Sequence, residues 1–581
     1  MNDYISRFLV CIETSLSKIF TLKSKVAYKY AYFLLIFEII LIVILLFMMG
    51  CSHQWTNPWD SSCLLDGGWR VLNGQKPHID FASPIGIIYH LIIMLGMKIA
   101  GPTGKSLTIG PLIIYPFITM WAWVIAKRRL TVINAFLFAS WSGIMIVATH
   151  RLDWTFNITT YALQYNRFGW SLIGIVFLQL LLPPRCKLSY RLTIFEYIST
   201  GIILVLLLFI KITYFALSVP AVILYFIFFR GEFQRWIWMV ISFITLFFVV
   251  LVYLDFNLLA FINDLRMLAG VHNFSSRILH LFSIFRKNFE GLGLLLIIGF
   301  LLIKPMIKQD LKQNEYGWIR FALISSTIAF CGLVICSTNW QKTNIPLFAL
   351  AGLIMCEDFH RRFFNKGNSI MDKNDTVVRH LWSSFISIYM ISAILIPDAG
   401  SVAYSFAWKM SKADKMPQSA RIQSKTMQDM IFPPNDKESR SEQSVMKSIL
   451  DIDPNNKVLF TPFQYVYWVN NGLTLLRKHI SSDSIILSMD SYNPFSFALE
   501  LQSPRGDMHS WTYGYLNDEY NSPKTQVLFQ DATHVMVPKR SYILEWHFKL
   551  RMYGDYIEKH FDKIDESELW ILYNSKDKNP I

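Results

Sequence analysis

The chain has 581 residues, of which 53% are hydrophobic, 15% are aromatic and only 17% are charged. This exceeds the apolar content that one soluble core can bury, so a soluble fold is excluded for most of the chain. The formal net charge of +14 would suggest nucleic-acid binding in a soluble protein, but the Lys and Arg residues lie mainly in short segments between apolar runs. We therefore interpret the charge as membrane topology and expect no nucleic-acid partner.

Apolar runs with about the length that an α-helix needs to cross a bilayer recur along the first two thirds of the chain. The first run covers residues 32–49, and the lysines before it predict a cytoplasmic N-terminal segment at residues 1–30, amphipathic over residues 4–20. Further runs lie at residues 85–100, 107–126, 132–148, 168–182, 192–210, 215–229, 236–254, 292–303, 321–336, 345–356 and 381–396.

Basic segments between these runs mark the cytoplasmic side of the membrane at consistent intervals. An N-terminus inside and a C-terminus outside require an odd number of crossings, so we expect about 11 to 13 transmembrane helices. The odd number results if residues 85–100 lie along the membrane surface. It also results if a further span lies within residues 256–285, a segment that otherwise resembles an outer interfacial helix.

The sequence becomes polar from about residue 399 onward, after a transmembrane domain at residues 31–398. Short β-like runs at residues 458–460, 485–490, 534–538 and 569–573 alternate with helical stretches. The predicted fold class is a polytopic α-helical membrane protein with a soluble α/β domain at residues 399–581, on the outer side of the membrane.

Three carboxylates crowd the first outer loop, residues 50–84. Asp60 ends the run WTNPWD, Asp66 begins the run DGGWRVLNG, and Asp80 lies in the run PHIDFASPIG. Attack of a hydroxyl on an anomeric carbon with a phosphate leaving group needs a base at the hydroxyl and cations at the phosphate. Asp66 is the first choice for the base, Asp80 is a second catalytic carboxylate, and Asp60 is assigned to substrate binding. Helix capping is the alternative role for all three.

Residues 66–86 resemble the first-loop signature of the bacterial GT-C glycosyltransferases. The resemblance is to the branch related to the dolichyl-phosphate-mannose protein mannosyltransferases, the aminoarabinose transferases and the rhizobial lipopolysaccharide transferases of the Rgt type. It implies a GT-C-like fold in the bacterial inner membrane, a periplasmic C-terminal domain, a base at Asp66 and a second acidic residue at Asp80. The chain lacks the adjacent Asp-Glu pair and the His-Pro-Pro motif of the mannosyltransferase branch, so mannose is not implied.

Basic residues at the outer ends of apolar runs predict where the phosphate of the donor binds. Arg151, Arg167 and Lys211 occupy such positions, and snorkelling or local pairing is the alternative for each. Tyr165 and Gln341 belong to outer segments that look similar in the same family, and both are predicted to contact the substrate.

The predicted function is transfer of a sugar, hexose or pentose, from a polyprenyl-phosphate donor to an envelope glycan, lipid or protein acceptor, in contact with membrane lipids. The main alternative is a lipid-linked glycan polymerase or flippase. No nucleotide-binding glycine loop is recognised, which disfavours a nucleotide-sugar donor. The sequence does not decide on a cofactor: the carboxylates are compatible with a divalent metal ion, which the sequence does not require.

Overall fold

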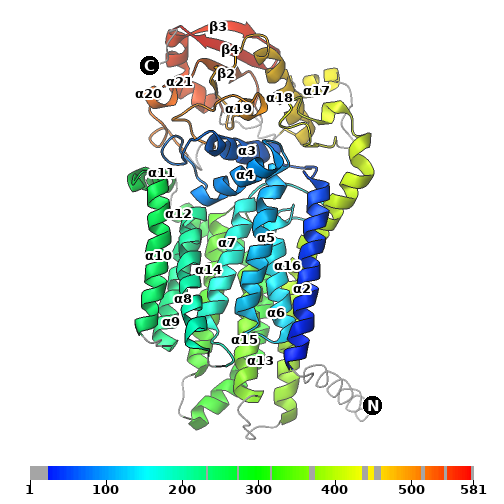
Figure 1. Ribbon diagram of the computed structural model, residues 1–581, viewed down its shortest axis with the longest axis vertical. Helices are drawn as coiled ribbons and strands as arrows, with labels where there is room; N and C mark the ends of the chain where they lie inside the picture. The colour runs from blue at the N-terminus through cyan, green and yellow to red at the C-terminus, as the bar shows by residue number, and fades with distance from the viewer. Residues whose placement is uncertain are drawn as a thin grey trace.

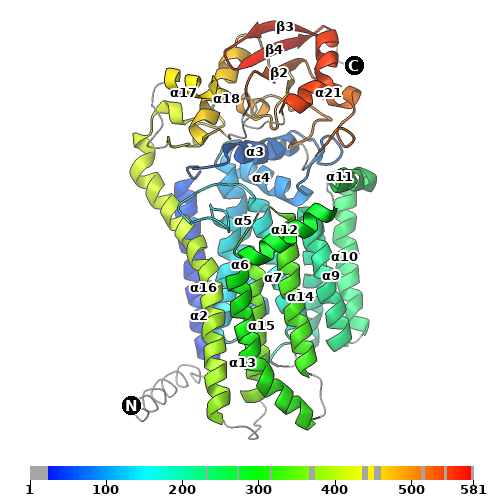
Figure 2. The same cartoon turned by 180° about the vertical axis from the view of Figure 1, so that it is seen from behind.

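The protein is described by a computed structural model over residues 24–186, 188–229, 233–270, 274–313, 317–339, 341–364, 373–434, 442–450, 460–511, 517–541 and 546–576. The predicted amphipathic segment at residues 4–20 and most of the β-like run at residues 458–460 lie outside these ranges. The molecule is elongated: a bundle of long helices carries a small α/β domain at one end (Figures 1 and 2).

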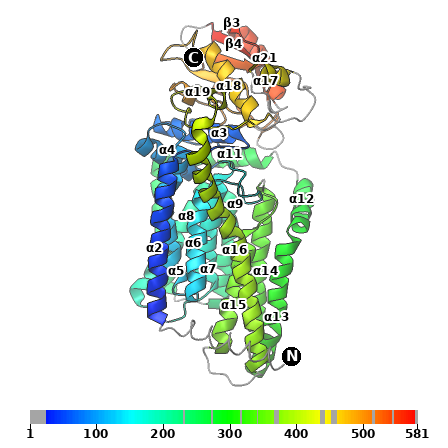
Figure 3. The same ribbon diagram turned by 90° about the vertical axis from the view of Figure 1, so that its right-hand side faces the viewer.

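The bundle contains the apolar helices that the sequence predicts. Seven helices of the described ranges are long and apolar enough to cross a membrane, by length and composition. They are α2 (Ser24–Met49), α5 (Ser106–Ala126), α8 (Tyr190–Ile210), α10 (Phe233–Tyr253), α13 (Phe289–Gln313), α14 (Gly317–Thr338) and α16 (Lys373–Lys412). Running beside them along the long axis are α6 (Val132–Val147), α7 (Gln164–Leu181), α9 (Ile212–Phe229) and α15 (Pro346–Phe364) (Figures 1 and 3).

The outside of the bundle carries large exposed apolar side chains, among them Phe37, Phe117 and Phe300. Such a surface is stable against lipid and unstable in water. The prediction of a multi-pass α-helical membrane protein is confirmed, while the number of crossings and the orientation in the membrane stay predictions.

Four shorter helices lie at the end of the bundle that faces the C-terminal domain (Figures 1 to 3). They are α3 (Pro58–Leu72), α4 (Ile87–Ala100), α11 (Leu258–Gly270) and α12 (Phe274–Lys287). Helix α4 has 14 residues and lies beneath α3 (Figure 1). Both features are compatible with the alternative in which residues 85–100 lie along the membrane surface. The first outer loop is therefore built largely of helix.

Close backbone contacts fix α4 against the bundle. The N–H of Gly86, directly before α4, donates to the carbonyl of Ile210 at 3.0 Å, and a Cβ at Gly86 would lie 2.0 Å from the carbonyl oxygen of Phe209. A Cβ at Gly110 of α5 would lie 2.4 Å from the carbonyl oxygen of Ile92 of α4. These contacts place the end of α8 directly below the first outer loop.

The C-terminal domain holds a four-stranded sheet in the order β1-β2-β4-β3. Strand β1 (Ile486–Ser488) is parallel to β2 (His534–Pro538), and β4 (Trp570–Ser575) is antiparallel to both β2 and β3 (Phe561–Glu566). The domain also contains α17 (Glu442–Leu450), α18 (Pro462–Leu476), α19 (Phe495–Ala498), α20 (Thr525–Leu528) and α21 (Trp546–His560). The predicted α/β domain is confirmed, with β1, β2 and β4 in three of the predicted β-like runs.

The two parts are joined by α16, which continues to Lys412, beyond the boundary predicted after residue 398. Short 3₁₀ turns at Ala413–Lys415 and Gln418–Ala420 follow it. Helix α18 begins with a capping box, in which the side chains of Thr461 and Gln464 bond each other's backbone N–H groups.

Candidate functional site

Asp60 and Asp66 lie on the same short helix, α3, but face different surroundings. The helix begins at Pro58, whose fixed φ and missing N–H suit the first helical position. Residues six apart on an α-helix are rotated by about 120° around its axis. Asp60 lies in the first turn, where the helix dipole favours a negative charge, and Asp66 lies in the middle of the helix.

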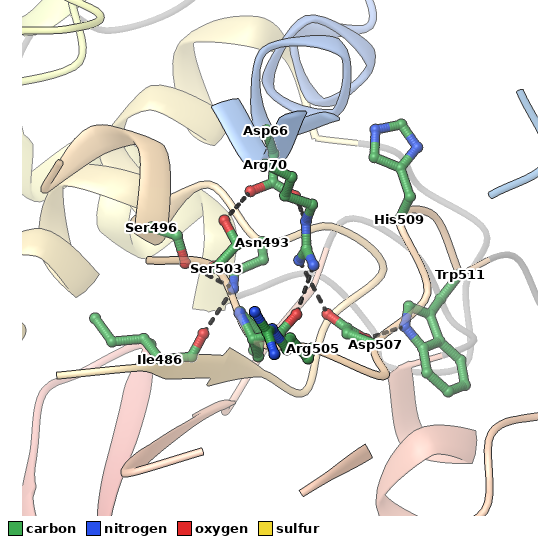
Figure 4. Close-up of polar contacts among 12 residues, drawn as sticks. Asp66, Arg70, Ile486, Asn493, Ser496, Ser503, Arg505, Asp507, His509 and Trp511 are labelled. Atoms are coloured by element: carbon green, nitrogen blue, oxygen red, sulfur yellow. Dashed lines mark hydrogen bonds and ion pairs between the residues drawn. The ribbon is translucent and has the colours of Figure 1, made fainter. Parts of the chain in front are cut away.

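Asp66 forms a buried ion pair with Arg70 (Figure 4). Its Oδ2 accepts from Arg70 Nε at 2.6 Å and its Oδ1 accepts from Ser503 Oγ at 2.7 Å. Asp66 is 2% exposed and Arg70 is 1% exposed. An acceptor hydroxyl has no approach to a carboxylate that is enclosed and bonded in this way, so the geometry supports a structural role for Asp66 and not the predicted role of base.

Asp80 also contacts the C-terminal domain. Its Oδ2 accepts from the backbone N–H of Lys76 at 2.7 Å, and its Oδ1 lies 3.7 Å from Arg505 Nε. Its backbone carbonyl accepts from the N–H of Gly506 at 2.7 Å. Gly506 has a φ of +72°, and a Cβ there would lie 2.1 Å from the carbonyl oxygen of Val527, so this close contact requires glycine. The structure thus places both predicted catalytic carboxylates against residues 503–507, at the contact between the two domains.

Asp60 has a more open environment. Its Oδ1 accepts from the hydroxyl of Tyr492 at 3.3 Å, and its Oδ2 accepts from Asn57 Nδ2 at 3.5 Å. Burial raises the pKa of the Asp60 carboxyl to about 6, while the bonds from Tyr492 and Asn57 and the charge of Arg151 lower it. A partly buried carboxylate with a pKa near neutrality and two long hydrogen bonds has the properties of a general base.

Arg151 lies close enough to Asp60 for its charge to lower the pKa of the carboxyl, and it forms a pair with Asp153. The pair is bidentate: Arg151 Nε lies 3.1 Å from Oδ1 and Nη2 lies 3.0 Å from Oδ2. The guanidinium also stacks 4.4 Å above the ring of Trp154. The local pairing offered as the alternative for Arg151 is present, and it holds the guanidinium in a fixed position beside Asp60.

Lys211 lies in the break between α8 and α9. Its Nζ donates to Asn339 Oδ1 and lies 5.5 Å from the centre of the Tyr165 ring. Burial lowers the pKa of Lys211 to about 8, and no carboxylate of the described residues forms an ion pair with it. A buried ammonium group without a counter-ion is suited to bind a phosphate. The structure therefore brings together Lys211 and Tyr165, each of which is a predicted substrate-binding residue.

Asn339 and the turn at residues 341–344 lie between Lys211 and Asp153. Asn339 accepts a hydrogen bond from Lys211, and the backbone N–H of Lys342 donates to Asp153 Oδ2 at 3.2 Å. Gln341 uses its amide nitrogen for two backbone carbonyls within the turn, at 2.9 Å each, and its amide oxygen for Trp170 Nε1 at 2.9 Å. The predicted substrate residue Gln341 thus fixes the shape of the turn.

Arg167 lies apart from this group. It is 3% exposed, and its Nη1 donates to Asp398 Oδ1 at 2.8 Å, while Nη2 donates to the carbonyl of His150. His150 Nε2 lies 2.9 Å from the same carboxylate oxygen. Arg167 therefore forms a buried ion pair with Asp398 between α7 and α16. This geometry does not support the predicted contact of Arg167 with phosphate.

Two residues of the candidate site were missed or undervalued on the sequence. Tyr492 comes from the C-terminal domain and carries no local signal. Asp153 was considered only as a partner of Arg151. No group of three or more His, Cys, Asp or Glu side chains in the described part of the chain could hold a metal ion.

Comparisons with known proteins give no match to a family model and none to a curated protein sequence. Among solved structures, the chain is similar to ArnT from Cupriavidus metallidurans bound to undecaprenyl phosphate, with a TM-score of 0.38, 9% identity and coverage of 93% of this chain and 97% of that chain. It is also similar to the oligosaccharyltransferase of Archaeoglobus fulgidus in complex with zinc and sulfate, with a TM-score of 0.34, 10% identity and coverage of 92% of this chain and 73% of that chain. At these levels of similarity, the roles of individual residues depend on the geometry of this chain alone.

Proposed function

We propose that the chain transfers a sugar from a polyprenyl-phosphate donor to an acceptor hydroxyl at the outer face of the membrane. The observation that carries this proposal is the grouping of a carboxylate of near-neutral pKa, Asp60, with a fixed guanidinium, Arg151, and a buried ammonium group, Lys211, that pairs with no carboxylate in the described part of the chain. Asp60 contacts Tyr492 of the C-terminal domain, and Lys211 follows the end of α8, where Ile210 bonds Gly86 just after the first outer loop. Glycosyl transfer from phosphate requires these components: a base for the acceptor and cations for the leaving group.

In the proposed reaction, Asp60 accepts the proton of the acceptor hydroxyl as its oxygen attacks the anomeric carbon. The bond between that carbon and the phosphate oxygen breaks, and the phosphate departs with the electron pair. Lys211 stabilises the charge that develops on the phosphate. Arg151, held by Asp153, keeps Asp60 ionised through its positive charge.

The position of Lys211 supports a lipid-linked donor. Lys211 ends a membrane helix, so a phosphate bound there lies at the membrane surface while a polyprenyl tail extends beside the apolar bundle. The resemblance of residues 66–86 to the first loop of the GT-C glycosyltransferases supports the same donor class. We propose a hexose or pentose as the sugar, an envelope glycan, lipid or protein as the acceptor, and a bacterial inner-membrane location with the C-terminal domain in the periplasm.

Mass spectrometry of envelope glycans and lipids from cells with and without the protein tests this proposal. The expected result is the loss of one sugar-sized mass from a glycan, lipid or protein, with accumulation of the corresponding polyprenyl-phosphate sugar. An unchanged set of sugar masses with altered glycan length would contradict the proposal and indicate a polymerase. A lipid-linked glycan trapped on the cytoplasmic side would indicate a flippase.

A further inference from the structure

Tyr492 reaches Asp60 from a rigid segment of the C-terminal domain. The carbonyl of Ser491, the residue before it, accepts a hydrogen bond from the N–H of Trp511 at 2.9 Å. The residue after it, Asn493, donates from Nδ2 to the carbonyl of Ile486 at 2.7 Å (Figure 4). Because both neighbours are fixed, the hydroxyl of Tyr492 is presented to Asp60 in a defined position.

Helix α3, which carries Asp60, is held by the same domain along its length. Tyr465 donates its hydroxyl to Ser62 Oγ at 3.0 Å, and Trp69 donates Nε1 to the carbonyl of Leu501 at 2.7 Å. Farther along, Arg70 donates to the carbonyl of Pro504 at 2.6 Å. The two sides of the contact between Tyr492 and Asp60 are therefore fixed relative to each other.

We infer that Tyr492 is a positioning residue for the base, through a hydrogen bond that holds one oxygen of the Asp60 carboxylate and leaves the other for the acceptor hydroxyl. This inference rests on the proposed function. The bond from Tyr492 goes to Oδ1. Within the described ranges, the second side-chain hydrogen bond to Asp60 comes from Asn57 and goes to Oδ2 at 3.5 Å. This is the long limit of a hydrogen bond, so an acceptor hydroxyl can replace it.

The hydrogen bond also favours the ionised carboxylate, because a hydroxyl donates more strongly to a negative oxygen than to a neutral one. The other titratable and charged groups around Asp60 are Arg151 of the segment between α6 and α7, Cys63 of α3 and Tyr465 of α18. Of these, Arg151 is the group that is charged at neutral pH. The C-terminal domain thereby becomes part of the catalytic unit, because it supplies a neutral donor to the base.

Carbodiimide labelling of the full-length protein in detergent measures the protonation of Asp60 without any substrate. N,N′-dicyclohexylcarbodiimide forms a stable adduct with a protonated carboxyl, so labelling falls as Asp60 ionises. Peptide mass spectrometry between pH 4.5 and 8 would give the midpoint for the wild type, for Tyr492→Phe and for the matched control Tyr465→Phe. The control removes a tyrosine hydroxyl from the same interface, but that hydroxyl bonds Ser62 and not Asp60.

The expected midpoint rises by about one pH unit in Tyr492→Phe, the lower end of the range for a hydrogen bond to a charged group, because the bond is long at 3.3 Å. It stays at the wild-type value in Tyr465→Phe. Equal midpoints in all three proteins would overturn the inference. Sugar transfer by Asp60→Asn, measured in parallel, separates the two proposals. If the midpoint shifts but Asp60→Asn transfers sugar normally, Asp60 is not the base. The proposed reaction and the role of Tyr492 as a positioning residue for the base then both fail. If the midpoint does not shift and Asp60→Asn is inactive, only the role of Tyr492 fails.

Discussion

The ion pair between Asp66 and Arg70 should act as a structural link between the first outer loop and the C-terminal domain. Both side chains are buried, and three of their further partners, Ser503, Pro504 and Asp507, belong to the C-terminal domain. Replacing either member of the pair leaves the other charge buried. The structure therefore predicts that Asp66→Ala and Arg70→Met each destabilise the folded protein.

The size of the effect follows from what each variant leaves behind. Removing one partner of a buried pair costs about 3–5 kcal/mol. In Asp66→Ala, Arg70 keeps the carbonyl of Pro504 at 2.6 Å and the carboxylate of Asp507 at 3.7 Å, which places the loss at the lower end, about 3 kcal/mol. In the double variant no unpaired charge remains from the pair. Its loss should therefore be at least about 2 kcal/mol smaller than the sum of the single losses.

Chemical denaturation of the purified variants in detergent, followed by tryptophan fluorescence, measures these free energies. A double-mutant cycle with Asp66→Ala, Arg70→Met and the combination gives the coupling energy directly. Losses that add within about 0.5 kcal/mol would refute the reasoning, because independent sites add in this way. Single variants as stable as the wild type would refute it as well.

Three further predictions concern the site and the bundle. Because the ionised form of Asp60 is the proposed base, the transfer rate should rise with pH and reach half its maximum near the pKa of about 6; a rate that is constant from pH 5 to 8 would contradict this. Lys211→Met should raise the KM for the polyprenyl-phosphate donor about tenfold or more, and Lys211→Arg should recover most of the loss in steady-state kinetics; an unchanged KM in Lys211→Met would contradict the phosphate role. Gly201→Ala should lower the yield of folded protein in size-exclusion chromatography, because its Cβ would lie 2.1 Å from Ser242 Oγ where α8 meets α10. The control Gly293→Ala should have no effect, because no neighbouring atom lies within 4 Å of a Cβ there.

The fold could be predicted to the extent that elements bury apolar side chains. The apolar runs along the chain predict the helices of the bundle. Strand β2 could be predicted because its sequence is a short apolar run, and the structure buries all five of its residues. Strand β3 was not predicted, because only Phe561 of its six residues is buried and the others are mostly charged and exposed. Whether residues 85–100 cross the membrane or lie along its surface could not be decided on the sequence, since their composition is as apolar as that of a span.

The sequence could not rank Asp60, Asp66 and Asp80 as candidates for the base, because the ranking depends on tertiary contacts. Asp66 pairs with Ser503, 437 residues away, and Asp60 receives its bond from Tyr492, 432 residues away. A local signal for Asp60 was present: Pro58 marks the first turn of a helix, and an acidic residue there lies at the end that favours a negative charge. Lys211 could be selected as a candidate on the sequence because a lone basic residue between two apolar runs has few roles other than binding an anion or pairing.

The most direct test of the central claim compares Asp60→Asn with Asp66→Asn in cells at equal amounts of folded protein. Mass spectrometry would measure the sugar added to the envelope acceptor and the pool of polyprenyl-phosphate sugar. We predict that Asp60→Asn loses transfer and accumulates the donor, whereas Asp66→Asn retains transfer per folded molecule. Normal transfer by Asp60→Asn, together with loss of transfer by folded Asp66→Asn, would contradict the assignment and return the role of base to Asp66.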